Sequence, residues 1–296
     1  MKKILLFVIA ALMVSKASIA QDDDTKKKFR AGLKFSMQPS WFTSGDPNTS
    51  KLKTGFGYGF GLVTDFRLSD VIYFSTGIGG DFENATVKFR DDGFNPYTSA
   101  GSTAFHTEYT LDNSNAFVEA KNGVDINQYY KDGYSTYALS SRKIKTTYVT
   151  IPISLKMLTK EFAGFRYFGQ FGGDLGIRVG AKAQDNYSYQ FHYTSAGGTL
   201  SGGGSSPYYN IGKDCSLLPF RFGMNIGLGA EYRMAGSTSL FLSVNYFRSF
   251  TNLMRNDSKY NYTSATFDSS NNQLTFTHLQ QKLMMSAIKI NIGVMF

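Results

Sequence analysis

The sequence has a single cysteine, and after position 20 it has no apolar run long enough to cross a membrane as a helix. Cys215 alone excludes an internal disulfide framework, and no histidine lies near it in sequence to complete a metal site. We interpret it as a small apolar residue at the foot of a strand. Basic residues never form a run longer than 26–28, and no motif of a nucleic-acid-binding module occurs. Nucleic acid is therefore excluded as a partner.

The first twenty residues have the pattern of a secretory signal peptide. Lys2 and Lys3 open it, residues 4–14 are apolar, and residues 18–20 supply small side chains at the two positions that matter for cleavage. The apolar run is shorter than the roughly 20 residues of a membrane-spanning anchor. We therefore expect export of the chain and cleavage before Gln21.

Strict alternation of polarity is the dominant pattern in the rest of the chain, and segment 218–234 shows it best. Its even positions carry mainly Phe, Met, Ile, Leu and Tyr, whereas its odd positions from 221 onward carry Arg, Gly, Asn and Glu. Side chains of a strand alternate between two faces, so one face is apolar along its whole length. Strands of soluble proteins usually have five or six residues, whereas a strand that crosses a bilayer and projects beyond it needs this greater length. We predict lipid on the apolar face and a lumen on the other.

Segment 54–68 repeats the pattern with glycine as the small residue. Gly55, Gly57, Gly59 and Gly61 share one face. A nucleotide-binding loop would need uneven glycine spacing and a following helix, and neither is present. Glycine that faces a narrow lumen leaves room for long side chains from opposite strands. We therefore predict that this glycine row faces the lumen.

Eight segments alternate in this way: 29–41, 54–68, 71–89, 143–157, 165–183, 218–234, 239–250 and 283–296. Their connections are alternately short (68–70, 158–164, 235–238) and long and polar (42–53, 90–142, 184–217, 251–282). Tight periplasmic turns, long outer loops and an even strand number are typical of a transmembrane barrel. We predict an all-β, transmembrane, antiparallel up-and-down β-barrel over 29–296, after a short periplasmic segment 21–28. Ten strands are the alternative, because 104–111 also partly alternates.

Pro152 lies inside one of these predicted strands. Proline has no N–H to donate to a strand ladder and is normally found at sheet edges or bulges. A closed barrel has no edge, so we expect a β-bulge at Pro152.

The stretch 148–156 reads aromatic-x-x-Ile-Pro-apolar-x-apolar-Lys. Together with 31–36, 57–62, the glycine-rich 169–180 and the alternating C-terminal strand that ends on Phe296, it makes the chain resemble the PorT-like outer-membrane β-barrel family over most of its mature length. The resemblance implies an eight-stranded barrel in the cell outer membrane of a Gram-negative cell, inserted by the barrel-assembly machinery. Some relatives take part in a secretion system that moves proteins across the outer membrane. No catalytic residues carry over from the family.

The charged residues predicted to face the lumen lie on the strand faces opposite the apolar rows. They are Arg30, Lys34, Asp65, Arg67, Asp81, Glu83, Lys156, Arg166, Asp174, Arg178, Lys182, Arg221, Glu231, Arg233 and Lys289. Cleavage of the signal removes three of the 31 basic residues and no acidic one, so the net charge falls from +9 to +6. Opposite charges in a lumen of low dielectric constant should pair, and breaking one pair should cost about 3–5 kcal/mol. We interpret them as a salt-bridged plug rather than an ion path.

The three histidines fall in three different predicted outer loops. His106, His192 and His278 are weak candidates for a metal site, or for a general base beside Glu108 or Asp185. No motif spacing supports either role, and loop histidines are usually solvated. We therefore expect no catalytic residue, no cofactor and no metal site.

The predicted outer loops are also rich in tyrosine, interleaved with Asn, Ser and Gly. The tyrosines are Tyr97, Tyr109, Tyr129, Tyr130, Tyr134, Tyr137, Tyr187, Tyr189, Tyr193, Tyr208, Tyr209, Tyr260 and Tyr262. This composition is typical of binding loops. It is equally typical of the aromatic girdle at a membrane interface. Both interpretations stay open.

The expected function is that of a non-enzymatic scaffold or binding protein, linked to protein secretion or to cell-surface interaction. Its expected partners are outer-membrane lipid, the barrel-assembly machinery and other envelope or secretion proteins. Two alternatives belong to other classes: an outer-rim membrane enzyme acting on lipid or peptide, and a small-solute pore.

Overall fold

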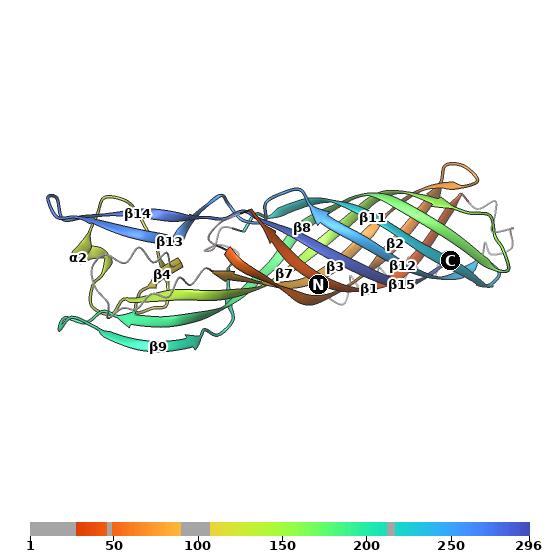
Figure 1. The fold of residues 1–296 in the computed structure, drawn as a ribbon. Helices are drawn as coiled ribbons and strands as arrows, with labels where there is room; N and C mark the ends of the chain where they lie inside the picture. The colour runs from red at the N-terminus through yellow and green to blue at the C-terminus, as the bar shows by residue number, and fades with distance from the viewer. Residues whose placement is uncertain (1–27, 46–48, 90–106, 212–216) are drawn as a thin grey trace, which may run out of the picture.

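The structure is a computed structural model that describes residues 28–45, 49–89, 107–211 and 217–296. Long antiparallel strands, all tilted in the same sense, form a closed ring. Shorter elements form a second body that continues from one end of the ring (Figure 1). We call this second body the head. The predicted signal peptide, His106 and Cys215 lie outside the described residues.

Eight strands make the ring, and each one overlaps a segment predicted from the alternation. They are β1 (Phe29–Ser44), β2 (Thr49–Arg67), β3 (Ile72–Phe89), β7 (Ser135–Leu158), β8 (Phe165–His192), β11 (Phe220–Ala235), β12 (Thr238–Ser249) and β15 (Leu283–Met295). Hydrogen-bonded neighbours run β8-β11-β12-β15-β1-β2-β3-β7, and β7 pairs with β8 to close the ring. The predicted eight-stranded antiparallel barrel is therefore confirmed.

The C-terminal strand closes the wall against the first strand. Met295 lies opposite Gly32, and the backbone N–H of Phe296 donates to the carbonyl of Ala31 at 2.8 Å. Large apolar side chains cover the outside of the ring, for example Phe56 at 61% exposure and Leu228 at 73%. Lipid is the solvent that suits such a wall. Among the described residues, no helix is long and apolar enough to span a bilayer.

The strand that contains Pro152 keeps its register there. Pro152 lies opposite Asp174 on β8, and the irregularity lies instead between the pairs Thr147–Gly180 and Tyr148–Arg178. The bulge predicted at Pro152 is therefore wrong. A proline removes one N–H donor but adds no residue to the strand, so the pairing on either side continues. Its carbonyl is still used, because the hydroxyl of Thr76 donates to it at 2.7 Å.

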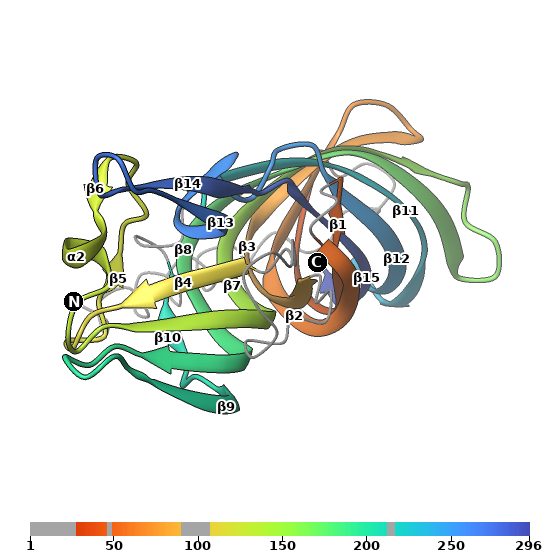
Figure 2. The same cartoon turned by 60° about the vertical axis from the view of Figure 1, so that its left-hand side comes forward.

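The head is built mainly from strands. It contains β4 (Thr107–Leu111), β5 (Phe117–Val118), β6 (Val124–Asp125), α2 (Ile126–Tyr129), β9 (Thr199–Ser205), β13 (Asp257–Asp268) and β14 (Gln273–Gln280), with β10 (Tyr209–Asn210) at its base. β7 and β8 run on beyond the ring, and β4 and β9 pair with these extensions (Figure 2). β13 then joins β4, and β14 joins β13.

Two observations differ from the expected polar loops. The described parts of 90–142, 184–217 and 251–282 contain the strands of the head rather than irregular loops alone. The alternative of ten ring strands is wrong, because the residues from its extra segment that the structure describes form β4, which pairs with β7 in the head and lies outside the ring.

An apolar core fills the barrel where the ring meets the head. Phe42, Val87, Ile144, Phe247 and Met285 belong to it, and each is at most 2% exposed. Inward-facing side chains here are mainly apolar, and the buried pair Arg142–Asp185 lies among them. This apolar core, which we call the apolar plug, closes the interior of the barrel at its head end.

Candidate functional site: a sealed lumen beneath a strand-built head

Charged side chains form a compact cluster in the half of the lumen near the short turns. Glu231 accepts from Arg30 at 2.9 Å, lies 3.3 Å from Arg166 and contacts Lys156. Asp65 accepts from Arg30 at 2.9 Å and from Lys156 at 3.1 Å. All five side chains are buried. Two carboxylates thus share three cations, which gives each buried charge at least one partner.

A second cluster lies around Lys289 on the C-terminal strand. Its ammonium group donates to Asp81 at 2.9 Å and to Asp174 at 3.1 Å. Gln38 donates to Asp81 at 2.8 Å, and Asn225 donates to Asp174 at 3.0 Å. Residues from β1, β3, β8, β11 and β15 are therefore tied together across the lumen.

Arg221 closes the polar part of the lumen below the apolar plug. It is buried, its guanidinium contacts Glu83, and it lies 4.1 Å from the centre of the Tyr148 ring and 4.7 Å from that of Phe247. A cavity of about 40 Å³ remains in the lumen, with Lys34 among its lining residues. That volume holds a few water molecules. The side chains therefore fill the lumen as a plug.

Glycines make this packing possible, as predicted. A Cβ on Gly59 would lie 2.5 Å from both the Asp81 carboxylate and the Gln38 amide, so a larger residue would displace that hydrogen-bonded pair. A Cβ on Gly227 would lie 2.5 Å from the Asn245 side chain. The lumen-facing interpretation of the glycine rows is confirmed.

Most residues predicted for the lumen lie there. Ten of the fifteen are buried: Arg30, Asp65, Asp81, Glu83, Lys156, Arg166, Asp174, Arg221, Glu231 and Lys289. Four are half-buried: Lys34, Arg67, Arg178 and Arg233. Arg67 contacts Asp70 and Arg233 contacts Glu161, both at the end with short turns.

Lys182 is the one prediction of this set that is wrong, because it is exposed on the outside of the wall. Val179 is an extra residue in β8 opposite the pair Thr147–Tyr148 of β7. The extra residue shifts the parity of the following part of β8, so Asp185 faces inward instead. There Asp185 forms a buried ion pair with Arg142, which the sequence pattern did not predict.

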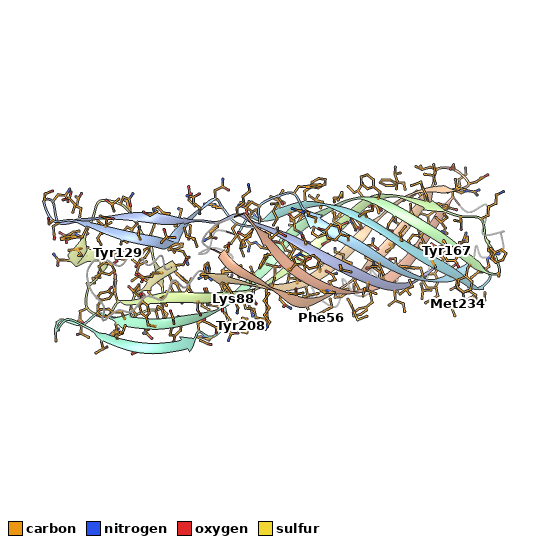
Figure 3. All side chains as sticks on the ribbon, viewed as in Figure 1. Phe56, Lys88, Tyr129, Tyr167, Tyr208 and Met234 are labelled. Carbon is orange, nitrogen blue, oxygen red and sulfur yellow. The ribbon has the colours of Figure 1, made fainter. Side chains whose placement is uncertain are left out.

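Tyrosines build the core of the head. The Tyr129 ring lies 4.7 Å from the Phe276 ring, and the Tyr262 ring lies 5.0 Å from it, centre to centre. Both tyrosines are 2% exposed, and Figure 3 shows Tyr129 far from the barrel wall. Burial raises the pKa of both phenols well above the usual value near 10. These two side chains therefore belong neither to a contact surface nor to a membrane girdle.

The described histidines lie apart. His192 on β8 bonds Ser135 through Nδ1 at 2.9 Å, whereas His278 lies on β14 opposite Tyr262. Strands β7, β4 and β13 separate β8 from β14, and His106 lies outside the described residues. Glu108 accepts from the Tyr189 hydroxyl at 2.7 Å. In the described part of the chain no group of three or more His, Cys, Asp or Glu residues is arranged to hold a metal.

The outward apolar wall and inward paired charges are the arrangement of a membrane barrel. A family profile described as outer membrane protein beta-barrel domain matches residues 19–255. The chain belongs to this outer membrane protein beta-barrel domain family. As a member, it is a protein of the cell outer membrane.

The chain is also similar to several solved structures. One is the attachment invasion locus protein Ail of Yersinia pestis, which shares 10% sequence identity with this chain at a TM-score of 0.31. The match covers 91% of this chain and 100% of that chain. The neisserial surface protein A has 8% identity, a TM-score of 0.31 and coverage of 90% and 97%. OprG of Pseudomonas aeruginosa has 9% identity, a TM-score of 0.33 and coverage of 90% and 94%. The comparison with curated proteins finds no match.

Proposed function

We propose that this barrel is a non-enzymatic cell-surface binding protein, whose sealed wall holds a strand-built head outside the membrane to contact partner proteins or external ligands. One observation carries the proposal: β7 and β8, of 24 and 28 residues, continue from the wall into the head. A head built on the same strands as the wall is held in a defined orientation, which lowers the entropy lost on binding.

The filled lumen argues against a small-solute pore. Arg221, Lys289 and Glu231 are each buried and contact opposite charges, and the apolar plug lies above them. Moving ions through would require these pairs to separate in a medium of low dielectric constant. We expect no steady conductance from the purified protein in planar bilayers, and a steady current would contradict the proposal.

The separation of His192 from His278 argues against a rim enzyme. A general base would need a carboxylate beside a histidine, and Glu108 and Asp185 were the candidates. Asp185 instead pairs with Arg142, and Glu108 accepts a hydrogen bond from Tyr189. A purified monomer that hydrolyses lipid or peptide would contradict the proposal.

The finer assignment is that the protein is PorT-like and contacts envelope or secretion proteins. It is supported by the Ile-Pro strand at 151–152, which the structure places in β7. Deletion of the gene, followed by comparison of the secreted and surface proteomes, tests it. Loss of a set of secreted proteins supports the secretion role, and unchanged proteomes contradict it.

Site-specific photo-crosslinking tests the binding role itself. Phe267 on β13 is a large apolar side chain of the head with 45% exposure, so a photoreactive amino acid placed there samples the head's surroundings. The matched control is the same amino acid at Leu242, 56% exposed on the barrel wall. We expect a discrete protein or glycan adduct from position 267 and lipid adducts alone from position 242. Absence of any adduct from position 267 in intact cells contradicts the proposal.

A further inference from the structure

Five lysines lie on the outside of four neighbouring strands at the level where the ring ends. They are Lys53 on β2, Lys88 on β3, Lys143 and Lys145 on β7, and Lys182 on β8, and we call them the basic belt. Four of them are exposed and Lys143 is half-buried. Figure 3 shows Lys88 between the wall and the head.

Strand register places these lysines close together. Lys145 lies directly opposite Lys182, while Lys53 and Lys143 lie opposite Thr86 from its two sides. Neighbouring strands are about 4.7–4.9 Å apart, so the ammonium groups share one patch of surface. Like charges directly opposite each other on paired strands destabilise a sheet. The basic belt therefore lowers the stability of the isolated protein.

Within the described residues, the belt lysines differ from the lumenal cations in their charge partners. Arg30, Lys156 and Lys289 each contact at least one carboxylate. In contrast, no ion pair joins a belt lysine to an acidic residue within the described residues. Lys145 instead lies 4.1 Å from the centre of the Tyr208 ring, a contact that leaves its charge in place.

The height of the belt on the wall indicates what neutralises it. Outward apolar residues cover β7 from Met157, at the end with short turns, up to Val149. Twelve residues of tilted strand separate Met157 from Lys145, which is about 30 Å along the membrane normal. The lipid-facing band of such barrels is about 25 Å tall. Lys145, and Lys182 opposite it, therefore lie just beyond the hydrocarbon, at the depth of the lipid headgroups, and the strand register places the other three lysines further toward the head.

We propose that the basic belt binds the phosphate groups of membrane-lipid headgroups on the head side of the barrel. Anionic headgroups supply negative charge opposite the belt lysines, and the adjoining apolar wall contacts the acyl chains of the same lipids. Thr86 on β3, which lies between Lys53 and Lys143, offers a hydrogen bond to a headgroup hydroxyl. This inference depends on the membrane position of the barrel and not on what the head binds.

Native mass spectrometry of the full mature protein in mild detergent tests the proposal. The probes are a bisphosphorylated lipid A, phosphatidylglycerol and zwitterionic phosphatidylcholine, with inorganic phosphate as a soluble competitor. The variant is Lys88→Gln with Lys145→Gln and Lys182→Gln. The matched control is Lys121→Gln with Lys160→Gln and Lys259→Gln, three exposed lysines outside the belt that give the same change of net charge. All six side chains are exposed, so both triple variants should fold.

We expect lipid A to bind the unaltered protein at least tenfold more tightly than phosphatidylcholine, with phosphatidylglycerol between them. A lysine near an anionic membrane surface contributes roughly a fivefold change in binding, so the belt variant should lose most of this preference. The control should keep it. Equal loss in both variants, no preference for anionic lipid, or displacement of bound lipid by millimolar inorganic phosphate would each overturn the proposal.

Discussion

Arg142 and Asp185 form a two-point ion pair between β7 and β8 at the level where the ring becomes the head. The guanidinium donates to the two carboxylate oxygens at 2.7 and 2.9 Å, and both side chains are buried. The Tyr209 hydroxyl also donates to Asp185, which ties strand β10 to the same carboxylate. This pair joins the two strands that carry the head.

Asp185→Asn should therefore loosen the head. The change removes the negative charge that Asp185 supplies to the buried Arg142 guanidinium, at a cost of about 3–5 kcal/mol. We expect a lower unfolding midpoint in detergent and earlier cleavage of the head by protease. Asp70→Asn is the control, because Asp70 pairs with Arg67 at an exposed turn. Equal sensitivity of the two variants would contradict this role.

Gly59→Val should impair assembly of the barrel. Its Cβ would overlap the Asp81 and Gln38 side chains, which lie 2.5 Å from that position. Overpacking of this kind costs about 1–3 kcal/mol. Gly202→Val provides a comparison on β9, where nothing lies within 4 Å of the added Cβ. Migration in unheated gels measures the folded fraction, and a fully folded Gly59→Val barrel would refute the packing argument.

The head should be sensitive to alkali. Burial raises the pKa of the Tyr193 phenol to about 12, and it raises the pKa values of Tyr129 and Tyr262 as well. A phenol whose pKa is raised on folding ionises first in the unfolded chain. Its stabilising contribution is therefore complete below pH 10, the usual value, and declines as the pH rises through 12.

Phenolate absorbance during alkaline titration measures this effect. We expect an early step from solvent-exposed tyrosines and a later, cooperative step as the head opens. Tyr129→Phe with Tyr262→Phe should shrink the late step. A single transition centred at pH 10 would contradict the buried aromatic core.

The histidines should be dispensable for chemistry. Alanine at His106, His192 and His278 together should leave metal content unchanged and produce no change in lipase or protease assays. Within the described residues, the expected structural effect is the loss of the Ser135–His192 hydrogen bond. Loss of bound metal or of a measurable hydrolytic activity in the triple variant would support a metal site or a catalytic site at the outer rim.

The wall of the barrel could be predicted from local sequence because each of its strands carries its own evidence. Phe56, Tyr58 and Phe60 alternate with glycines on β2. A period of two is typical of an extended strand whose two faces meet different surroundings, here lipid and the lumen. The parity of Arg30, Glu231 and Lys289 relative to those apolar rows sufficed to place them in the lumen.

The head could not be predicted in the same way. Strands β4, β13 and β14 lie together through pairings such as Tyr262–Glu108, between segments far apart in the chain. Bulges break the alternation in β7 near Leu139, so the period-two signal is lost where the head begins. Tyr129 and Tyr262 looked like surface residues because tyrosine is equally common in binding loops and at membrane interfaces.

The sequence by itself determined an exported, eight-stranded wall with apolar residues outside and charges inside, because alternation within one strand is a local property. Tertiary structure alone decided which charges meet and which side Lys182 and Asp185 face. One extra residue, Val179, reverses the faces beyond it, and a bulge is visible only against the partner strand. The same reversal sends Asp185 inward to Arg142 and leaves Lys182 outside beside Lys145.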